Sequence, residues 1–374
     1  MSFLIGKTVN FIPEEVKLAL TAEKWAESEL FNGLSPNSRI SNEAVWDEVL
    51  SSCNYLPATY TNSNILYQWQ YQQGLDGCCQ DLSIIINSNN KPVAIWPLSL
   101  SKIDNFYSLT SHGLPVHPPL FVKGCSVSIQ KRIIKCCFEL SNIISNVSGI
   151  KMWQSSDSFL DLNGLSSWHI LAKGGGAKSV LAYDLFIDLR QDLNQIKSGF
   201  RRSYRSLVNS GLKNWTVGIL DVPNKKVWQS FKDLHKKVAG RTTRNNETWE
   251  IQFNDIANQQ AFLIYLLNND GEMDGAGFFN FTKDEGLYSV AAYKRELFDK
   301  PLGHVVQYRA IQELKKRKVR WYKLGSRPYA TDNPPPSKKE ISIGEFKQGF
   351  ASHIFPRYLI THFVKDPNLN NSKG

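Results

Sequence analysis

The sequence predicts an α/β protein built from two domains. Its 374 residues exceed the roughly 100 to 200 residues that one domain usually contains. Hydrophobic residues make up 42% of the chain and charged residues 21%, so there is enough apolar surface to build two cores. Each half shows a hairpin pattern, helical spacing and a short strand in a similar order. Each domain is therefore expected to hold a central mixed sheet flanked by helices.

The domain boundary is expected in the stretch AKGGGAKS, Ala172–Ser179, where three glycines interrupt apolar sequence. Glycine-rich segments are typical of linkers, so we assign residues 1–177 and 178–374 to the two domains. The glycines do not indicate a phosphate-binding P-loop, because the required G-K-[ST] is absent and the strand-like run VLAYDLFIDL follows.

The first half contains a predicted hairpin, a helix and a strand. Two β-branched runs separated by Asn87–Asn90 indicate the hairpin. Apolar residues at helical spacing over 131–145 indicate the helix, and residues 151–154 read as the strand. A loop rich in Pro and Gly carries His112 and His117. With no third ligand nearby, packing or surface roles suit these histidines better than metal ligation.

The second half begins with a predicted helix over 196–211, which carries Arg201, Arg202 and Arg205 and stops at Gly211. The elements expected next are a helix over 227–238 ending at Gly240, a basic loop, an apolar segment over 261–267, a hairpin over 275–293, a helix over 305–318 and a strand over 319–325.

The formal net charge of +10 favours an anionic partner: nucleic acid, a phosphorylated cofactor, a nucleotide-linked substrate or a membrane surface. Charge alone does not choose among them. The densest basic run, KKRKVR from Lys315, follows apolar residues at four-residue spacing, so we interpret it as the solvated face of a helix end. Nothing in the sequence specifies an oligomeric state.

Cysteine spacing and hydropathy indicate a cytoplasmic protein without a membrane span. The six cysteines include two adjacent pairs and no C-x-x-C, a pattern that suits neither a zinc site nor a disulfide framework. The start of the chain lacks a basic segment followed by a long apolar run, and no later stretch approaches the roughly 18 apolar residues of a spanning helix.

Several polar residues of the second half are candidates for chemistry. A helix N-terminus near Leu302 and Gly303 could hold a phosphate through its unpaired N–H groups. His304, in the first turn, would stay neutral beside the positive helix end and could act as a general base, or it could simply fix the loop. Tyr288 and Tyr293 could donate a proton to a leaving group or line a cleft, although core tyrosines are common.

The loop GRTTRNNETW supplies Arg241 and Arg244 together with Trp249. Two guanidinium groups and an indole could grip a phosphate and stack a base or sugar. The alternative is a solvated helix-capping loop.

Four segments in order resemble the FemAB-like branch of the GNAT acyltransferase superfamily, relatives of enzymes that add amino acids to peptidoglycan precursors. They are GFRRSYRSLVNSG, GRTTRNNETWEIQ, LYSVAAYKRELFDKPLGHVVQYRAIQELK and KEISIGEFKQGFA. The resemblance is clearest over Tyr183–Phe363.

The resemblance implies two GNAT-like domains, acyl transfer to an amine in a cleft, no metal and no tightly bound cofactor. Arg201 and Arg202 match a cluster that contacts the phosphates of a nucleotide-linked acceptor. Phe346 and Lys347 match a pair that lines the channel where acyl group and acceptor meet. A fixed cation there would stabilise the oxyanion of the tetrahedral intermediate.

The donor stays open between an acyl-CoA and an aminoacyl-tRNA. The segment ELFDKPLGH offers only Gly303 where acetyl-CoA-dependent members have a Q/R-x-x-G-x-G/A loop. The long charged helical hairpin associated with tRNA contact in some members is absent, since no sustained heptad pattern occurs. Alternative functions are an acetyl-CoA-dependent N-acetyltransferase and a non-catalytic RNA-binding protein.

Two geometric expectations follow. Arg201, Arg202, Arg241 and Arg244 should border one cleft, because clustered arginines repel unless an anion offsets them. Alternation in the run ISIGEF predicts a strand, and Lys347 should project from its end toward Phe346 and the hairpin tyrosines.

Overall fold

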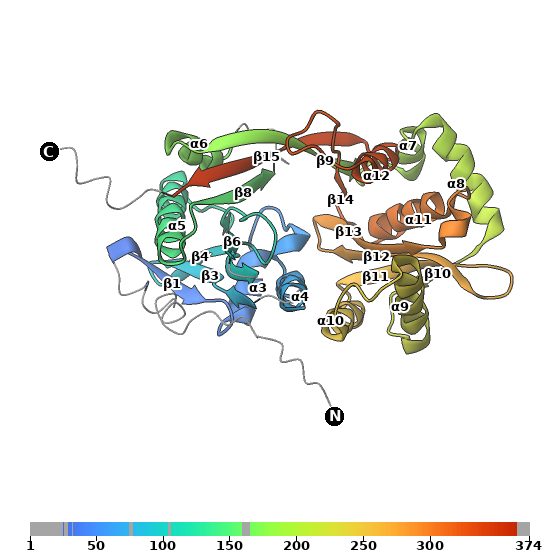
Figure 1. The fold of residues 1–374 in the computed structure, drawn as a ribbon, viewed down its shortest axis with the longest axis horizontal. Helices are drawn as coiled ribbons and strands as arrows, with labels where there is room; N and C mark the ends of the chain where they lie inside the picture. Colours follow the sequence, from blue (N-terminus) through green and yellow to red (C-terminus); the bar gives the residue numbers. More distant parts are fainter. Residues whose placement is uncertain are drawn as a thin grey trace, which may run out of the picture. The chain divides into compact units, whose positions relative to one another are not determined.

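The computed structural model describes residues 25, 29–31, 33–74, 78–103, 106–158 and 165–364. The start of the chain, on which the expectation of no secretion leader rests, lies outside the described residues. Two compact units are present (Figure 1). Unit 1 takes the described residues within 1–54, 60–181 and 357–374, and unit 2 takes 55–59 and 182–356.

The division differs from the predicted domains in three segments. Residues 55–59 belong to unit 2, whereas residues 178–181 and those from Arg357 onward belong to unit 1. The strands β9, Lys178–Asp188, and β15, His353–Phe363, each contain residues of both units. The glycine stretch is no extended linker, because Gly174 ends helix α6, Ser167–Gly174, and β9 begins four residues later.

Unit 1 contains two small sheets and a strand pair. The hairpin of β3, Ile84–Ser88, and β4, Lys91–Trp96, confirms the predicted one, with Asn89 and Asn90 at φ 50° and 60° in its turn. The first sheet has the order β1-β3-β4-β7 and the second β2-β5-β6, and β8 pairs with β15. The remaining strands are β1, Leu34–Ser38, β2, Cys78–Asp81, β5, Ser99–Ile103, β6, Phe106–Thr110, β7, Leu120–Phe121, and β8, Met152–Ser158.

Helix α5, Val127–Val147, packs one face into the unit 1 core. Its residues Ile133, Cys137, Leu140 and Ile144 are fully buried, which confirms the helical spacing read from the sequence. Unit 1 also holds α3, Glu43–Ser51, α4, Asn62–Gln73, and the 3-10 turn η1, Glu29–Phe31, while η2, Ala58–Tyr60, spans the unit boundary.

Unit 2 is built on a six-stranded run in the order β10-β11-β12-β13-β14-β9. Neighbouring strands are antiparallel except β13 and β14, which are parallel, so this is the expected mixed sheet. The strands are β10, Thr216–Leu220, β11, Ala261–Leu267, β12, Met273–Phe281, β13, Glu285–Tyr293, and β14, Trp321–Ser326.

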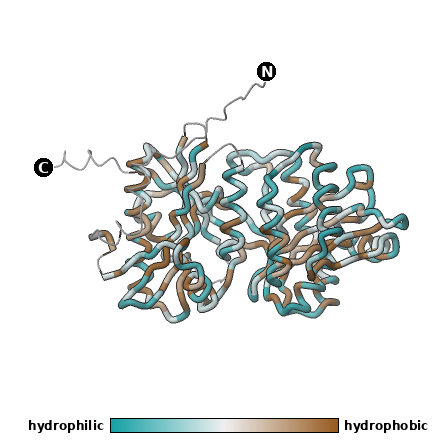
Figure 2. Tube along the Cα trace, turned by 90° about the horizontal axis from the view of Figure 1, so that it is seen from below, coloured by the Kyte–Doolittle hydropathy of each residue, from teal (hydrophilic) through white to brown (hydrophobic). Residues whose placement is uncertain are grey.

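Helices cover both faces of this sheet, because alternate residues of each strand point to opposite sides. Phe262 and Ile264 of β11 pack with helix α11, whereas Leu263 packs with Trp228 and Phe231 of helix α9. One face is covered by α7, Leu193–Ser198, α8, Arg202–Asn214, α11, Leu302–Lys316, and α12, Lys338–Gln348; the other by α9, Lys225–Ala239, and α10, Asn246–Ala257. Figure 2 shows hydrophobic stretches within each unit and hydrophilic ones mainly outside.

Three predicted elements of unit 2 differ in the structure. The helix expected over 196–211 is two helices, α7 and α8, broken at Gly199–Arg201. Gly211 lies inside α8, where a Cβ would meet Val305 at 2.4 Å, so it serves close packing and not helix termination. The basic loop continues into α10, whose N-cap is Asn245.

The run ISIGEF is helical, so the strand prediction was wrong. It lies within α12, which begins after Ser337 and has a capping box made by Ser337 and Glu340. A capping box satisfies two free N–H groups at a helix start, and this local signal outweighs the alternation of apolar residues.

Within the part of the chain that the structure describes, no helix is both long enough and apolar enough to cross a bilayer.

Candidate active site in unit 2

The unit 2 sheet opens between its two parallel strands. β13 and β14 pair over Glu285–Leu287 and Trp321–Lys323. Beyond these residues β13 stays paired with β12 and β14 with β9, but no further β13–β14 pairing occurs among the described residues. One edge of each strand is therefore free of its neighbour, as a site for an extended ligand requires.

Lys347 reaches this opening from the last turn of α12. Its Nζ lies 5.5 Å from the centre of the Tyr288 ring on β13. On β14, a Cβ added to Gly325 would lie 2.7 Å from the same nitrogen. The expected approach of Lys347 to the hairpin tyrosines is thus present, although a helix delivers it.

The Lys347 ammonium is half-buried without a fixed counter-ion. Burial lowers its pKa below the ordinary lysine value, and the charge of Asp184 opposes that shift only partly. Asp184 itself lies 3.1 Å from Lys323 Nζ. Among the described residues, Lys347 makes no hydrogen bond or ion pair. A desolvated cation in this state is suited to an anionic ligand or to negative charge that develops during a reaction.

Two tyrosines form a hydroxyl pair on β13. The hydroxyl oxygens of Tyr288 and Tyr293 are 2.9 Å apart. Burial raises the pKa of Tyr288 to about 12 and that of Tyr293 well above its ordinary value, so both stay protonated near neutral pH. Next to them, the Tyr322 hydroxyl donates to Oε1 of Gln307 at 2.5 Å. The pair could therefore pass a proton to a leaving group.

His304 is a neutral imidazole beside Phe346. Its ring packs edge-on against Tyr204, with centroids 4.4 Å apart, and against Phe346 at 5.2 Å. Burial lowers the pKa of His304 to about 4. Within the described part of the chain, its Nε2 is buried without a hydrogen-bond partner. A neutral imidazole has one ring nitrogen with a free lone pair, so His304 has the chemistry of a base.

The start of α11 is packed against protein side chains. Leu302 is 1% exposed and belongs to the core. A Cβ on Gly303 would lie 2.9 Å from Cζ of Phe346, so the close approach that Gly303 permits is made by this ring. These packing contacts account for a leucine and a glycine at these two positions without a ligand. A cofactor-binding role for Leu302 and Gly303 stays a prediction.

Arg201 and Arg202 lie beside α12. Arg201, the N-cap residue of α8, donates weakly from Nη2 to the Glu345 carbonyl at 3.5 Å, and its guanidinium lies 5.2 Å from the Tyr204 ring centre. Arg202 is exposed. Both arginines therefore belong to the sheet face that carries Phe346 and Lys347.

Arg241 and Arg244 lie on the opposite face of the sheet, with α9 and α10. Arg244 is 8% exposed and stacks on Trp249 with 3.5 Å between the guanidinium carbon and the ring centre. Since α8 and α9 cover different faces, the expectation of one cleft bordered by all four arginines is wrong. Trp249 is buried against Trp228 and has Arg244 on its face, so it holds this arginine and offers no open ring for a base.

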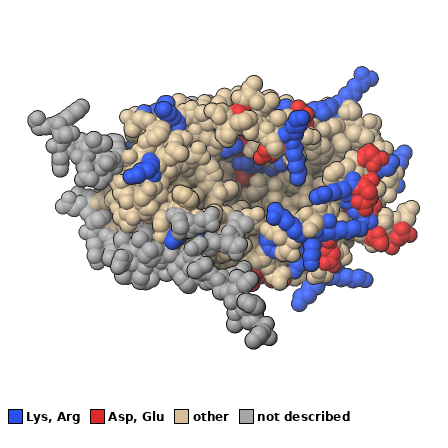
Figure 3. Space-filling view, in the orientation of Figure 1, with Lys and Arg blue, Asp and Glu red and all other residues tan. Residues whose placement is uncertain are grey.

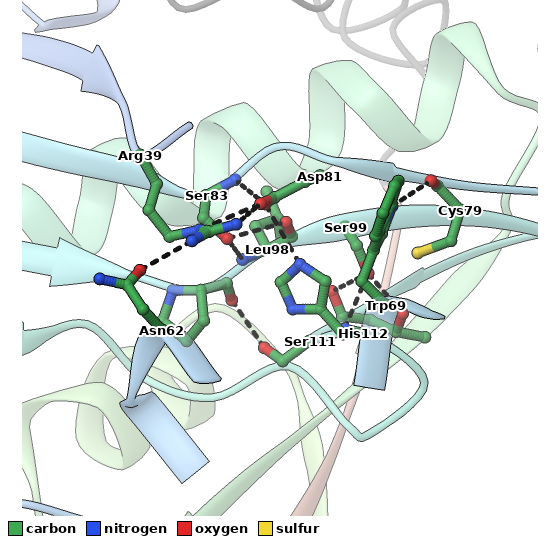
Figure 4. A network of polar contacts seen from close by, with 12 residues as sticks. Arg39, Asn62, Trp69, Cys79, Asp81, Ser83, Leu98, Ser99, Ser111 and His112 are labelled. Carbon is green, nitrogen blue, oxygen red and sulfur yellow. Dashed lines mark hydrogen bonds and ion pairs between the residues drawn. The ribbon is translucent and has the colours of Figure 1, made fainter. Parts of the chain in front are cut away.

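His112 of unit 1 belongs to a buried ion-pair network, shown in Figure 4. Its Nε2 lies 3.1 Å from Oδ1 of Asp81, and Arg39 binds the other oxygen through Nη2 at 2.6 Å. His117 stacks on Tyr60 at 5.4 Å. Within the described ranges, no group of three His, Cys, Asp or Glu side chains could hold a metal ion. His112 is thus held in the ion-pair network, and His117 packs on Tyr60.

Sequence patterns missed three residues of the site. Gln307 is fully buried on the apolar side of α11, and Asp184 is 2% exposed in an apolar strand. A polar residue inside a hydrophobic stripe was the available signal for both. Gly325 gave no signal, because its φ of +123° and its approach to Lys347 depend on a bulge in β14.

Comparison with known proteins relied on structure, because no family model matches the sequence and no curated protein does. The crystal structure of FemX superposes with a TM-score of 0.64 at 12% identity, covering 89% of this chain and 98% of FemX. The chain has the FemX fold. This likeness confirms the α/β class and the fold of the FemAB-like GNAT branch.

Two further structures share the FemX fold with this chain. The C-terminal domain of a putative lysylphosphatidylglycerol synthetase from Agrobacterium fabrum gives a TM-score of 0.56 at 11% identity, covering 88% of this chain and 93% of that one. A tandem GNAT protein from the clavulanic acid biosynthesis pathway gives 0.50 at 13%, covering 89% and 98%. The tandem architecture agrees with two GNAT-like units.

Substituting Gly325 by alanine should displace Lys347. The new methyl group would lie 2.7 Å from Nζ at a backbone φ of +123°, a conformation that costs other residues about 1 to 3 kcal/mol. We expect lower turnover together with a lower urea midpoint. Gly271→Ala is the matched control, because Gly271 has φ +78° and nothing within 4 Å. Equal loss of turnover in both variants would remove the positional role of Gly325.

Proposed function

We propose that the chain is an acyltransferase that moves an acyl or aminoacyl group onto an amine, with its reaction centre at the opening between β13 and β14. The observation that carries this proposal is the position of Lys347, a desolvated cation beside Tyr288 and Gly325 that has no ion-pair partner among the residues the structure describes. The FemX fold supports an acyltransferase of the GNAT type.

In the proposed reaction, the acceptor amine attacks the acyl carbonyl and an oxyanion forms. The Lys347 ammonium stabilises that oxyanion. A cation already fixed in a water-excluded site stabilises the developing negative charge without any rearrangement of the protein. The proton released by the amine goes to His304, which burial keeps neutral. When the intermediate collapses, the bond to the leaving group breaks and the Tyr288–Tyr293 pair supplies its proton. The proton held by His304 then replaces the one that the tyrosine pair has lost, so both groups return to their starting states.

The proposed acceptor is a nucleotide-linked or lipid-linked amino sugar, or another cell-envelope precursor. Arg201 and Arg202 lie beside α12 and could bind its phosphates, since guanidinium groups form paired hydrogen bonds with phosphate oxygens. The likeness to FemX and to a lysylphosphatidylglycerol synthetase domain supports an acceptor of this class.

For the donor, the proposal keeps both an acyl-CoA and an aminoacyl-tRNA. The free edges of β13 and β14 could hydrogen-bond an extended amide chain, which favours a thioester carrier. Acetyl-CoA itself is less well supported, because Phe346 fills the space beside Gly303 at the start of α11. We place the reaction in the cytoplasm, where both donors occur.

The proposal is tested by supplying donors and acceptors in pairs to the purified protein. Mass spectrometry of protein isolated without added ligand first identifies any compound carried from the cell. Acyl-CoA and aminoacyl-tRNA pools are then incubated with the protein and uridine-diphosphate-linked amino sugars, and the masses of the products are measured by mass spectrometry. A mass gain on the acceptor that requires Lys347 supports the function. Absence of transfer for every pair, with a folded protein, contradicts it.

A further inference from the structure

The α9–α10 face of unit 2 contains a pocket that the proposed reaction does not use. Its volume is about 220 Å³. The residues that line it come from α9, from the loop after Gly240 and from the start of α10; among them are Lys232, Lys236, Arg241, Arg244 and Trp249. Since α9 and Lys347 lie on different faces of the sheet, this pocket is separate from the candidate active site.

The pocket is strongly cationic. Its lining includes four Lys and Arg side chains against one carboxylate, Asp233, which also accepts a hydrogen bond from Gln229 at 2.9 Å. Burial and the charge of Arg244 lower the pKa of His235, so this histidine adds no charge near neutral pH. Cations close together repel one another, and an anion in the pocket would offset the charges of Lys232, Lys236 and Arg241.

The walls of the pocket hold their cations in place. Arg244 is fixed over Trp249 at 3.5 Å, and Lys232 Nζ lies 5.9 Å from the same ring centre. Lys236 comes from the last turn of α9. Arg241 is exposed at the rim. Two fixed and two adjustable cations around one cavity match the several oxygens of a phosphate or pyrophosphate group.

We propose that this pocket binds a small phosphorylated ligand through its phosphate or pyrophosphate group. A volume of about 220 Å³ suits a compact anion with a short attachment. The indole of Trp249 is covered by Arg244 and packed against Trp228, so the pocket offers no open aromatic face for stacking the bases of a single strand. These features favour a small ligand over RNA, although Figure 3 shows Lys and Arg side chains gathered over the part of unit 2 that holds α8 and α9.

The test measures pyrophosphate binding by isothermal titration calorimetry at constant ionic strength. We expect saturable binding of one pyrophosphate per chain. Arg241→Gln and Lys236→Gln should each weaken it about 10-fold, as loss of one charge-assisted contact would. Lys226→Gln is the matched control, because Lys226 is exposed on α9 and lies outside the pocket lining; it should change the affinity less than about 2-fold.

Location and independence are checked with two further measurements. Pyrophosphate should slow amide hydrogen exchange over residues 241–249, and Lys347→Met should bind it as wild type does. Three results would overturn the proposal: no saturable binding, equal weakening by Lys226→Gln, or short single-stranded RNA that binds more tightly than pyrophosphate with a steep loss of affinity in salt. None of these results bears on acyl transfer at Lys347, so the two proposals fail separately.

Discussion

Lys347→Met is expected to lower acyl-transfer turnover by about 100-fold or more while the protein stays folded, the size of effect seen when one oxyanion donor is removed. Methionine keeps most of the side-chain volume and removes the charge. Burial lowers the lysine pKa, and Lys347 makes no ion pair among the described residues, so the substitution removes none from the folded state. Turnover under saturating donor and the urea midpoint are the two measurements.

Lys338→Met is the matched control, since Lys338 is exposed at the first turn of the same helix. Its turnover should equal that of wild type. Equal turnover in Lys347→Met would remove the catalytic assignment, whereas a parallel loss of stability and activity would point to a structural lysine. The pH profile adds a second readout: turnover should fall on the alkaline side at a pH below that of an ordinary lysine, because the cation is lost there.

Asp81→Asn is expected to destabilise unit 1 by about 3 to 5 kcal/mol, the usual cost of removing one partner from a buried ion pair. Arg39 is 5% exposed and would lose the carboxylate that its Nη2 contacts at 2.6 Å. Urea unfolding measures the loss. Glu139→Gln, an exposed change on α5, should leave the midpoint nearly unchanged. A change below 1 kcal/mol in Asp81→Asn would contradict the structural role of the pair.

The same pair gives stability a defined dependence on pH. Burial opposes ionisation of Asp81, but His112 and Arg39 hold its pKa well below the usual range. Its contribution is therefore complete above the unfolded value near 3.9 and is lost as pH falls through the folded value. The stability difference between wild type and Asp81→Asn should be constant from pH 7 to 5 and shrink below about pH 4. A difference that grows with acid would contradict this assignment.

Local patterns predicted many elements of the fold. Helix α9 ends at Gly240 with φ +71°, as the glycine and the periodic apolar residues indicated. The hairpin through Asn89 and Asn90 follows from turn chemistry of the same kind. In each case, residues close together in sequence determine the structure.

Features that depend on distant contacts were not predictable from those patterns. The ISIGEF run alternates like a strand, but capping at Ser337 and packing of Phe346 against His304 and Tyr204 stabilise a helix. Arg201 and Arg244 lie in similar basic segments, and only the packing of α8 and α9 places them on opposite faces of the sheet. The proximity of Lys347 to Tyr288 was expected from the family resemblance. The bulge at Gly325 could be recognised only in the three-dimensional structure.

Because β9 and β15 each contain residues of both units, and residues 55–59 belong to unit 2, neither unit is a continuous piece of chain. During synthesis, β8 can pair with β15 only after the ribosome has made residues 353–363. Unit 1 therefore cannot finish folding before unit 2 has been translated, in contrast to the usual N-terminal-first order. Expression of either half alone leaves unpaired strands, so domain-by-domain dissection of this protein requires circular permutation, not truncation.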